Sequence, residues 1–250
     1  MFCLLALAEA KRRSYPYPYP HEIRQPYQRP RPIERRHRHH RAESNADGLP
    51  FSSRLVCLRK PAIYLYPTKE MNLTVSVNLK QNQFTAVVPE FTAENYWNVT
   101  AKPNGELIYK NKVIPYLFWE ALSGMKMNFK SGFYVKKGEA RQFLEKTLTQ
   151  IKLNDREKFD FMTYWLPTFN KLGDVFCSFQ LDNYCHSAPL GISVKPDSLI
   201  RVFLAIRKAQ PGDNLKPVQQ LPNAVRKGFT IVEWGGAVVN GCSRRVSRLQ

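Results

Sequence analysis

Two glutamates set beside tryptophans are the residues whose types and surroundings could support catalysis. Glu120 follows Trp119, and Glu233 precedes Trp234, each within strand-like sequence. Two carboxylates that meet in an aromatic cleft can cleave a glycosidic bond, one as general acid and the other as its partner. The alternative is that each carboxylate is satisfied by lysine, arginine or backbone donors. A secreted carbohydrate-active hydrolase that uses Glu120 and Glu233 is therefore one hypothesis.

Histidine and cysteine supply the other reactive groups. An Arg/His tract contains His37, His39 and His40, which would hold a divalent metal only weakly because the neighbouring arginines repel it. His186 is adjacent to Cys185, and sequence neighbours rarely meet as base and nucleophile. The chain contains no G-x-S-x-G, H-E-x-x-H, P-loop or dinucleotide-binding fingerprint. These observations favour a non-enzymatic protein that needs no cofactor.

The chain is strongly basic, with 38 Lys and Arg against 20 Asp and Glu and a formal charge of +18. Residues 51–250 carry +13 and residues 11–50 carry +6, so both the folded part and its leader are basic. Such an excess predicts attraction to polyanions. We expect an acidic polysaccharide or an acidic matrix protein as the partner. No specific nucleic-acid partner is expected, because no RRM, KH, zinc-finger or helix-turn-helix signature is present.

The N-terminus and two sequons predict secretion. Residues 2–8 form a short apolar run followed by small-x-small patterns, so we expect residues 1–10 to be a signal peptide, although no basic residue precedes the run. The run is too short to span a membrane, which takes about 20 residues. Asn72 and Asn98 each begin an N-x-T sequon and are the predicted glycosylation sites. The expected location is extracellular.

Four cysteines remain once the signal peptide is removed, and they allow three disulfide connectivities. Cys177 and Cys185 flank a predicted turn, which favours a local bridge between them. Cys57 and Cys242 lie at the two ends of the domain, and domain ends are often close in space. The predicted pairs are Cys57–Cys242 and Cys177–Cys185. The alternatives that tie Cys57 to Cys177 or to Cys185 stay open.

The composition divides the chain into segments. Residues 11–52 form a basic arm rich in Tyr-Pro, Arg and His, whose alternating prolines favour an extended polyproline II conformation and which we expect to be disordered. Residues 53–242 form one domain, and residues 243–250 a basic tail.

The domain reads as mainly β. Residues 72–79 alternate apolar and polar side chains without fault, as a half-buried strand does. Residues 139–153 carry apolar side chains at helical spacing, and Asn154-x-x-Glu157 resembles a capping box. The segment 159–166 reads as an aromatic strand that stops at Pro167. Further strands are expected over 60–67, 84–88, 96–101, 106–110, 113–120, 175–179, 190–194, 200–206 and 229–234. The predicted fold class is α+β, an antiparallel β-sandwich-like meander with one or two inserted helices.

Five motifs occur in a set order: Lys60-Pro-Ala-Ile-Tyr-Leu-Tyr-Pro67, Tyr116-Leu-Phe-Trp-Glu120, Tyr164-Trp-Leu-Pro167, Pro196-Asp-Ser-Leu-Ile-Arg-Val-Phe203 and Gly228-Phe-Thr-Ile-Val-Glu-Trp-Gly-Gly236. Together they resemble an uncharacterised domain family whose marker is K-P-x-I-Y-L-Y-P. The resemblance spans roughly residues 57–236. It implies a single domain and supplies no activity.

These observations favour a secreted, basic, non-enzymatic extracellular-matrix or surface protein. Its β-rich domain, preceded by the basic arm, would bind acidic polymers or mineral-associated matrix. The hydrolase remains the alternative.

Deleting residues 11–50 is expected to leave the midpoint of thermal unfolding nearly unchanged, because a proline-rich arm buries little apolar surface. Calorimetry of the full chain and of the deletion variant would measure this. A large drop in the midpoint would show instead that the arm packs on the domain.

Overall fold

The computed structural model describes residues 55–80 and 82–239. The chain divides between Gly48 and Leu49, close to the predicted start of the domain. The predicted signal peptide, arm, Arg/His tract and basic tail therefore lie outside the described residues, as do His37, His39, His40 and Cys242. All that follows concerns the second unit.

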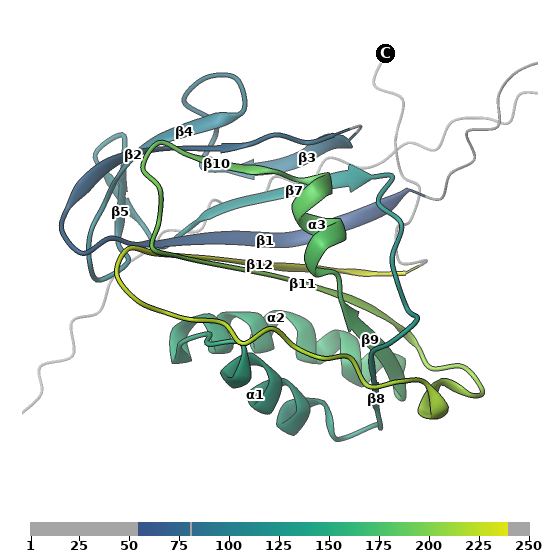
Figure 1. The fold of residues 1–250 in the computed structure, drawn as a ribbon. Coiled ribbons are helices and arrows are strands. Elements are labelled where there is room, and N and C mark those ends of the chain that lie inside the picture. Colours follow the sequence, from purple (N-terminus) through teal and green to yellow (C-terminus); the bar gives the residue numbers. More distant parts are fainter. Residues whose placement is uncertain (1–54, 81, 240–250) are drawn as a thin grey trace, which may run out of the picture. The chain divides into compact units, whose positions relative to one another are not determined.

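The described domain is mainly β and consists of two sheets and three helices (Figure 1). The larger sheet has the strand order β3-β7-β1-β12-β11-β9-β8, and the smaller one β10-β2-β4-β5-β6. The strands are β1 (Val56–Tyr66), β2 (Met71–Val77), β3 (Asn82–Val88), β4 (Tyr96–Ala101), β5 (Leu107–Tyr109), β6 (Lys112–Ile114), β7 (Leu117–Ser123), β8 (Phe133–Val135), β9 (Val175–Phe179), β10 (Leu190–Ile192), β11 (Ser198–Lys208) and β12 (Thr230–Val238). The helices are α1 (Ala140–Gln150), α2 (Asp155–Leu172), α3 (Leu181–Ser187) and a short 3-10 turn, η1 (Asp213–Leu215).

The seven-stranded sheet lies in the middle and has a core on each face (Figure 1). The core on one face, the inter-sheet core, is shared with the five-stranded sheet and α3; it includes Ile63, Val75, Trp97 and Trp119. The helix-side core on the other face is covered by α1 and α2; it includes Tyr64, Leu148, Phe161, Trp165 and Trp234. Strands of the larger sheet that lie between these two cores are therefore buried on both faces.

The predicted mainly β fold is confirmed, and so are its clearest elements. The alternating segment 72–79 contains β2, whose Leu73, Val75 and Val77 are buried. The amphipathic segment 139–153 contains α1. Among the described strands the one exception to antiparallel pairing is β11 beside β12, so the larger sheet is mixed.

The predicted strand over 159–166 is wrong, because these residues lie inside α2. The capping box at Asn154 and Glu157 starts the helix, as its sequence indicated. Phe161, Trp165 and Phe169 then recur every four residues and bury one face of the helix. The aromatic composition favoured a strand, but the four-residue spacing of these aromatic residues indicates a helix. None of the described helices is long and apolar enough to cross a membrane.

The predicted bridge between Cys177 and Cys185 is also wrong, because both are free thiols. The expected turn is the helix α3. Cys177 faces the helix-side core from β9, while α3 packs Tyr184 into the inter-sheet core, so the two cysteines approach the sheet from different sides. Cys57 is disulfide-bonded, and Cys242, its predicted partner, lies outside the described residues. Pairing of Cys57 with Cys242 remains a prediction.

Replacing Asn154 by Ala is expected to lower the free energy of unfolding by about 1–2 kcal/mol, because the side chain accepts from the backbone N–H of Glu157 at the start of α2. The matched control is Asn170→Ala, an exposed position in the last turn of α2, which should change stability by less than about 0.5 kcal/mol. Urea unfolding would measure both. Equal effects would show that the cap contributes little.

Candidate functional site

The central strand β1 is interrupted at Lys60 and Pro61 by a β-bulge. Between Arg59 and Ala62 it carries one residue more than the facing part of β12. Lys60 has a φ of 57°, a left-handed conformation that few non-glycine residues adopt. Its backbone N–H donates to a carboxylate oxygen of Glu120 at 3.2 Å. Strain of this kind is found preferentially at functional sites.

The Lys60 side chain lies among four aromatic rings, three of which belong to β7, α2 and β12 and one to the residue before β7. Its ammonium is 4.8 Å from the ring centroid of Tyr116 and 5.3 Å from that of Phe118. It is 5.9 Å from Tyr164 of α2 and 6.0 Å from Trp234 of β12. It also donates to the Tyr116 hydroxyl at 2.8 Å. Aromatic faces attract a cation through their negative quadrupole, so these rings hold the ammonium in one place.

A pocket of about 350 Å³ opens beside this ammonium, and we call it the Lys60 pocket. Its lining residues are Lys60, Val88, Pro89, Ile114, Pro115, Tyr116 and Phe118. The pocket is lined by residues of β3 and β7 and of the segments beside them. These two described strands contribute no buried side chain to the helix-side core. The pocket therefore lies beside α2, on a part of the sheet that the helices leave uncovered.

Two tyrosines of the same motif continue from the pocket toward α2. The buried Tyr64 donates to Asp160 at 2.8 Å, and its ring lies 5.2 Å from that of Tyr116. Burial, followed by the Asp160 carboxylate, raises the pKa of Tyr64. Burial, followed by Glu157, raises the pKa of Tyr66 to about 12. Both phenols are therefore neutral at physiological pH and act as hydrogen-bonding groups.

The structure does not bring the two candidate catalytic carboxylates together. Glu233 lies directly opposite Ile63 and so points to the inter-sheet core. Glu120 is the residue after Trp119 in β7, and Trp119 is buried in the inter-sheet core. Because adjacent residues of a strand point to opposite faces, Glu120 points to the other face of the sheet. Two carboxylates on opposite faces of one sheet cannot flank a single glycosidic bond.

Glu233 is fully buried and is satisfied internally. It accepts from Arg201 at 2.6 Å and from the Trp119 indole at 3.1 Å. Burial alone would lower the pKa of Arg201, but the charge of Glu233, the neighbouring Tyr184 and Cys185, and the hydrogen bond to Glu233 together raise that pKa. The Arg201 guanidinium also lies 4.7 Å from the ring centroid of Tyr184. Glu233 is therefore an ion-pair partner in the inter-sheet core.

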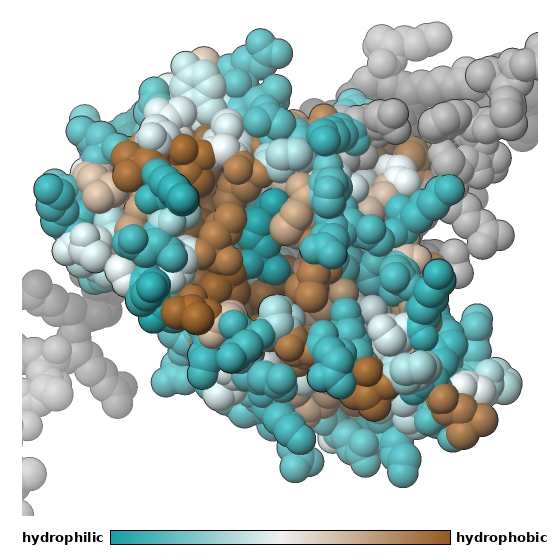
Figure 2. Space-filling view, in the orientation of Figure 1, coloured by the Kyte–Doolittle hydropathy of each residue, from teal (hydrophilic) through white to brown (hydrophobic). Residues whose placement is uncertain are grey.

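Cys185 and His186 do not form a catalytic dyad. The His186 ring nitrogen Nδ1 lies 2.7 Å from the backbone oxygen of Asp182, one turn back in α3. Burial raises the pKa of the Cys185 thiol, which disfavours the reactive thiolate. Cys185 and Arg201 line a 310 Å³ cavity between α3 and the segment after β11. Figure 2 shows apolar side chains gathered in the middle of the face on which α3 lies, among polar ones.

The two predicted glycosylation sites lie on one exposed face of the five-stranded sheet. Asn72 of β2 is paired with Thr100 of β4, and Asn98 with Thr74. Each threonine hydroxyl donates to the asparagine of the other sequon, at 2.6 Å to Asn72 and 2.8 Å to Asn98. Both asparagines are exposed and accessible to modification. Whether they carry glycans stays a prediction.

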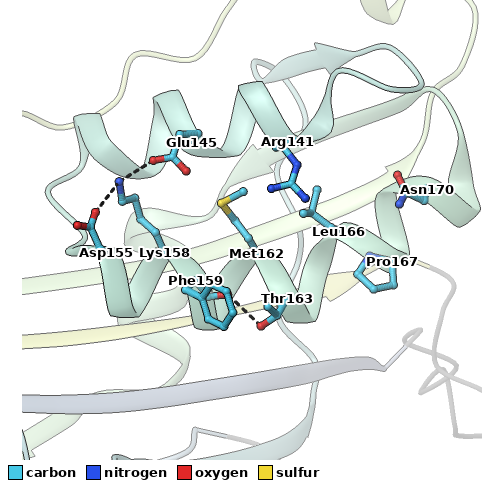
Figure 3. Close-up of a pocket in the computed structure, with 10 residues that line it drawn as sticks. All are labelled: Arg141, Glu145, Asp155, Lys158, Phe159, Met162, Thr163, Leu166, Pro167 and Asn170. Atoms are coloured by element: carbon cyan, nitrogen blue, oxygen red, sulfur yellow. Dashed lines mark hydrogen bonds and ion pairs between the residues drawn. The ribbon is translucent and has the colours of Figure 1, made fainter. Parts of the chain in front are cut away.

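A further groove of about 520 Å³ lies on the outer face of α1 and α2 (Figure 3). At one end Lys158 reaches Glu145 at 2.6 Å and Asp155 at 3.1 Å. Met162 and Leu166 form its middle. One ammonium against two carboxylates leaves this end with a negative charge, and the ten residues that line the groove include no histidine, cysteine or serine. The hydroxyl of Thr163, which also lines the groove, donates to the backbone oxygens of Phe159 and Asp160 and is not held by a base.

Sequence reasoning missed Lys60 as a candidate site residue. The motif that contains it was evident, but the aromatic rings come from β7 and the residue before it, from α2 and from β12, which are far apart in the chain. The signal that could have found it is the order of the five motifs, since four of them contribute to this one place. Among the described residues no group of three or more His, Cys, Asp and Glu could hold a metal ion.

Comparisons with known proteins add one relative. A stretch of 62 residues is 45% identical to a protein named "Uncharacterized protein in bglA 3'region" from Butyrivibrio fibrisolvens. It covers 24% of this chain and 64% of that protein, which is less than two thirds of its length. No family model matches the chain, and no solved structure matches it. The name of the relative assigns no activity.

Replacing Glu233 by Gln is expected to lower the free energy of unfolding by about 3–5 kcal/mol, because it leaves the charge of Arg201 buried without its partner. Glu120→Gln is the control and should cost about 1 kcal/mol, since it weakens one half-buried hydrogen bond. Guanidinium unfolding would measure both.

The double variant Arg201→Met with Glu233→Leu separates charge from packing. It removes both buried charges, so it should be more stable than Glu233→Gln alone. A double variant that is less stable than the single one would contradict the view that unpaired charge causes the loss.

Proposed function

We propose that this protein is a secreted, basic extracellular-matrix or surface protein that binds acidic polymers or mineral-associated matrix without catalysing a reaction. The observation that carries the proposal is the distribution of charge in the domain. Between residues 55 and 239, 24 Lys and Arg accompany 15 Asp and Glu. The basic excess therefore belongs to the folded domain and not only to the arm.

Several carboxylates are withdrawn from the surface into internal ion pairs. Glu157, Asp213 and Glu233 are buried, and each is bonded to an arginine. Two of their arginine partners, Arg201 and Arg207, are themselves nearly buried, with side chains 6% and 12% exposed. Excluding these three pairs leaves 21 Lys and Arg against 12 Asp and Glu. The excess of nine positive charges is the same with or without these pairs, so the internal pairs do not consume it, and it favours polyanionic partners.

Two features support the extracellular assignment. Cys57 is disulfide-bonded, and disulfides persist mainly in oxidising compartments. Asn72 and Asn98 both have exposed side chains on a strand face, where a glycan can be accommodated. The hydrolase alternative gains no such support, because Glu120 and Glu233 point to opposite faces of the sheet.

The full chain is expected to bind a heparin-like resin and to be released by moderate salt. The reason is that screening shortens the reach of exposed charges from about 10 Å at 0.1 M salt to about 3 Å at 1 M. Stepwise elution would measure the salt dependence, with an uncharged agarose resin as the control. Retention that does not change between low and high salt would contradict an electrostatic mode of binding.

A further inference from the structure

Within the described residues, no carboxylate forms an ion pair with the Lys60 ammonium. Among residues 55–80 and 82–239, no carboxylate oxygen lies within 4.0 Å of it. Its one hydrogen bond is to the Tyr116 hydroxyl, and its other contacts are with aromatic rings. Rings alone leave the N–H donors of an ammonium unsatisfied. The half-buried Lys60 therefore has free donors that an anion can use.

Tyr116 adds a second donor next to the first. Its hydroxyl oxygen accepts the hydrogen bond from Lys60 at 2.8 Å, so its own O–H remains available to donate. Two adjacent donors, one of them charged, match the two oxygens of a carboxylate. A single ammonium balances one negative charge, which fits a carboxylate better than a doubly charged phosphate.

The charges around the pocket leave it positive. Burial raises the pKa of the neighbouring Tyr164, Glu120 raises it further and Arg59 lowers it, so an anion and a cation both lie near this ring. Their charges oppose each other, and the charge of Lys60 is left over. An anion that enters the pocket therefore meets a net positive field.

The remaining walls of the Lys60 pocket are apolar. They consist of Val88, Pro89, Ile114, Pro115 and Phe118, and Val88 is 59% exposed at the rim. A pocket of 350 Å³ is at the lower end of the range for small-molecule sites, which is room for one ring and not for a stretch of polymer. The apolar C–H face of a pyranose ring can lie against such walls while a carboxylate on the ring reaches the donors.

We propose that the Lys60 pocket binds one uronic acid residue of an acidic polysaccharide, with the sugar carboxylate on Lys60 and Tyr116 and the ring against Phe118 and Val88. The inference rests on the proposed function, since it names the chemical class of the acidic polymer. Surface lysines would then supply general attraction along the polymer, and this pocket would select the carboxylated sugar. Sulfate groups elsewhere on the same polymer would be held by the exposed lysines alone.

The test titrates the full chain with glucuronate, glucose and glucose 6-sulfate, followed by calorimetry or by chemical-shift changes. Glucuronate is expected to bind more tightly than either of the others. Lys60→Met should weaken glucuronate binding at least about tenfold, because it removes a charge-assisted hydrogen bond. Lys195→Met, at an exposed lysine between β10 and β11, is the matched control and should leave binding unchanged.

A pair of variants at Val88 keeps the test valid if Lys60→Met does not fold. Val88→Glu places a negative charge at the exposed rim, whereas Val88→Gln has the same size without the charge, so Val88→Glu should bind glucuronate more weakly than Val88→Gln does. Equal binding by these two variants, or equal binding of glucuronate and glucose, would overturn the proposal.

Resin retention distinguishes this failure from that of the proposed function. Lys60→Met lowers the formal net charge of the chain from +18 by one, so the salt concentration that elutes it from heparin-like resin should hardly change. If the unaltered chain is retained on the resin but does not prefer glucuronate, the pocket assignment fails and the general function stands. If the unaltered chain is not retained at all, the general function fails.

Discussion

At Lys60 and Pro61 the central strand β1 carries one residue more than its neighbours, and this insertion reverses the alternation of its side chains. Leu58 and Ile63 both face the inter-sheet core although they are five residues apart. In a regular strand an odd separation would put them on opposite faces. Because of the bulge, Tyr64 and Tyr66 face α2 and not the five-stranded sheet.

The rest of the larger sheet accommodates the bulge. Glu120 of β7 accepts the N–H of Lys60, which the bulge would otherwise leave without a partner. On the other side, a Cβ on Gly235 of β12 would lie 3.0 Å from the Pro61 ring, so the absence of a side chain there admits the proline. A Cβ on Gly236 would lie 2.6 Å from the Trp165 ring. The paired glycines thus let both the bulge and α2 approach β12 closely.

The sequence predicted what depends on local pattern and failed where partners come from distant segments. Alternation along residues 72–79 is sufficient to define β2, and the capping box at Asn154 marks the start of α2. The aromatic residues of α2 were mistaken for a strand, because Phe and Trp are common in both helix and strand interiors. The paired roles of Arg201 and Glu233 depend on the parallel register of β11 and β12, which no local pattern contains.

The candidate site was hidden for the same reason. Lys60 belongs to an evident motif, but its significance depends on the order of strands in the sheet, which brings Phe118 and Trp234 to either side of it. Strand order is decided by the whole core and cannot be read from alternation. The two glutamates next to tryptophans were prominent in the sequence. The alternation of side chains along β7 and β12, however, places them on opposite faces of the sheet.

The energetics of Lys60 indicate why its chemistry matters more than its contribution to the fold. A lysine with a φ of 57° costs about 1–2 kcal/mol relative to a glycine, which adopts this conformation freely. One hydrogen bond to Tyr116 returns about 1 kcal/mol, and cation–π contacts return about 0.5–1 kcal/mol. These terms nearly cancel, and a glycine would keep the backbone N–H that Glu120 binds. The folded structure thus gains little from having a lysine at this point, while a ligand would gain a charge held in place beside an apolar pocket.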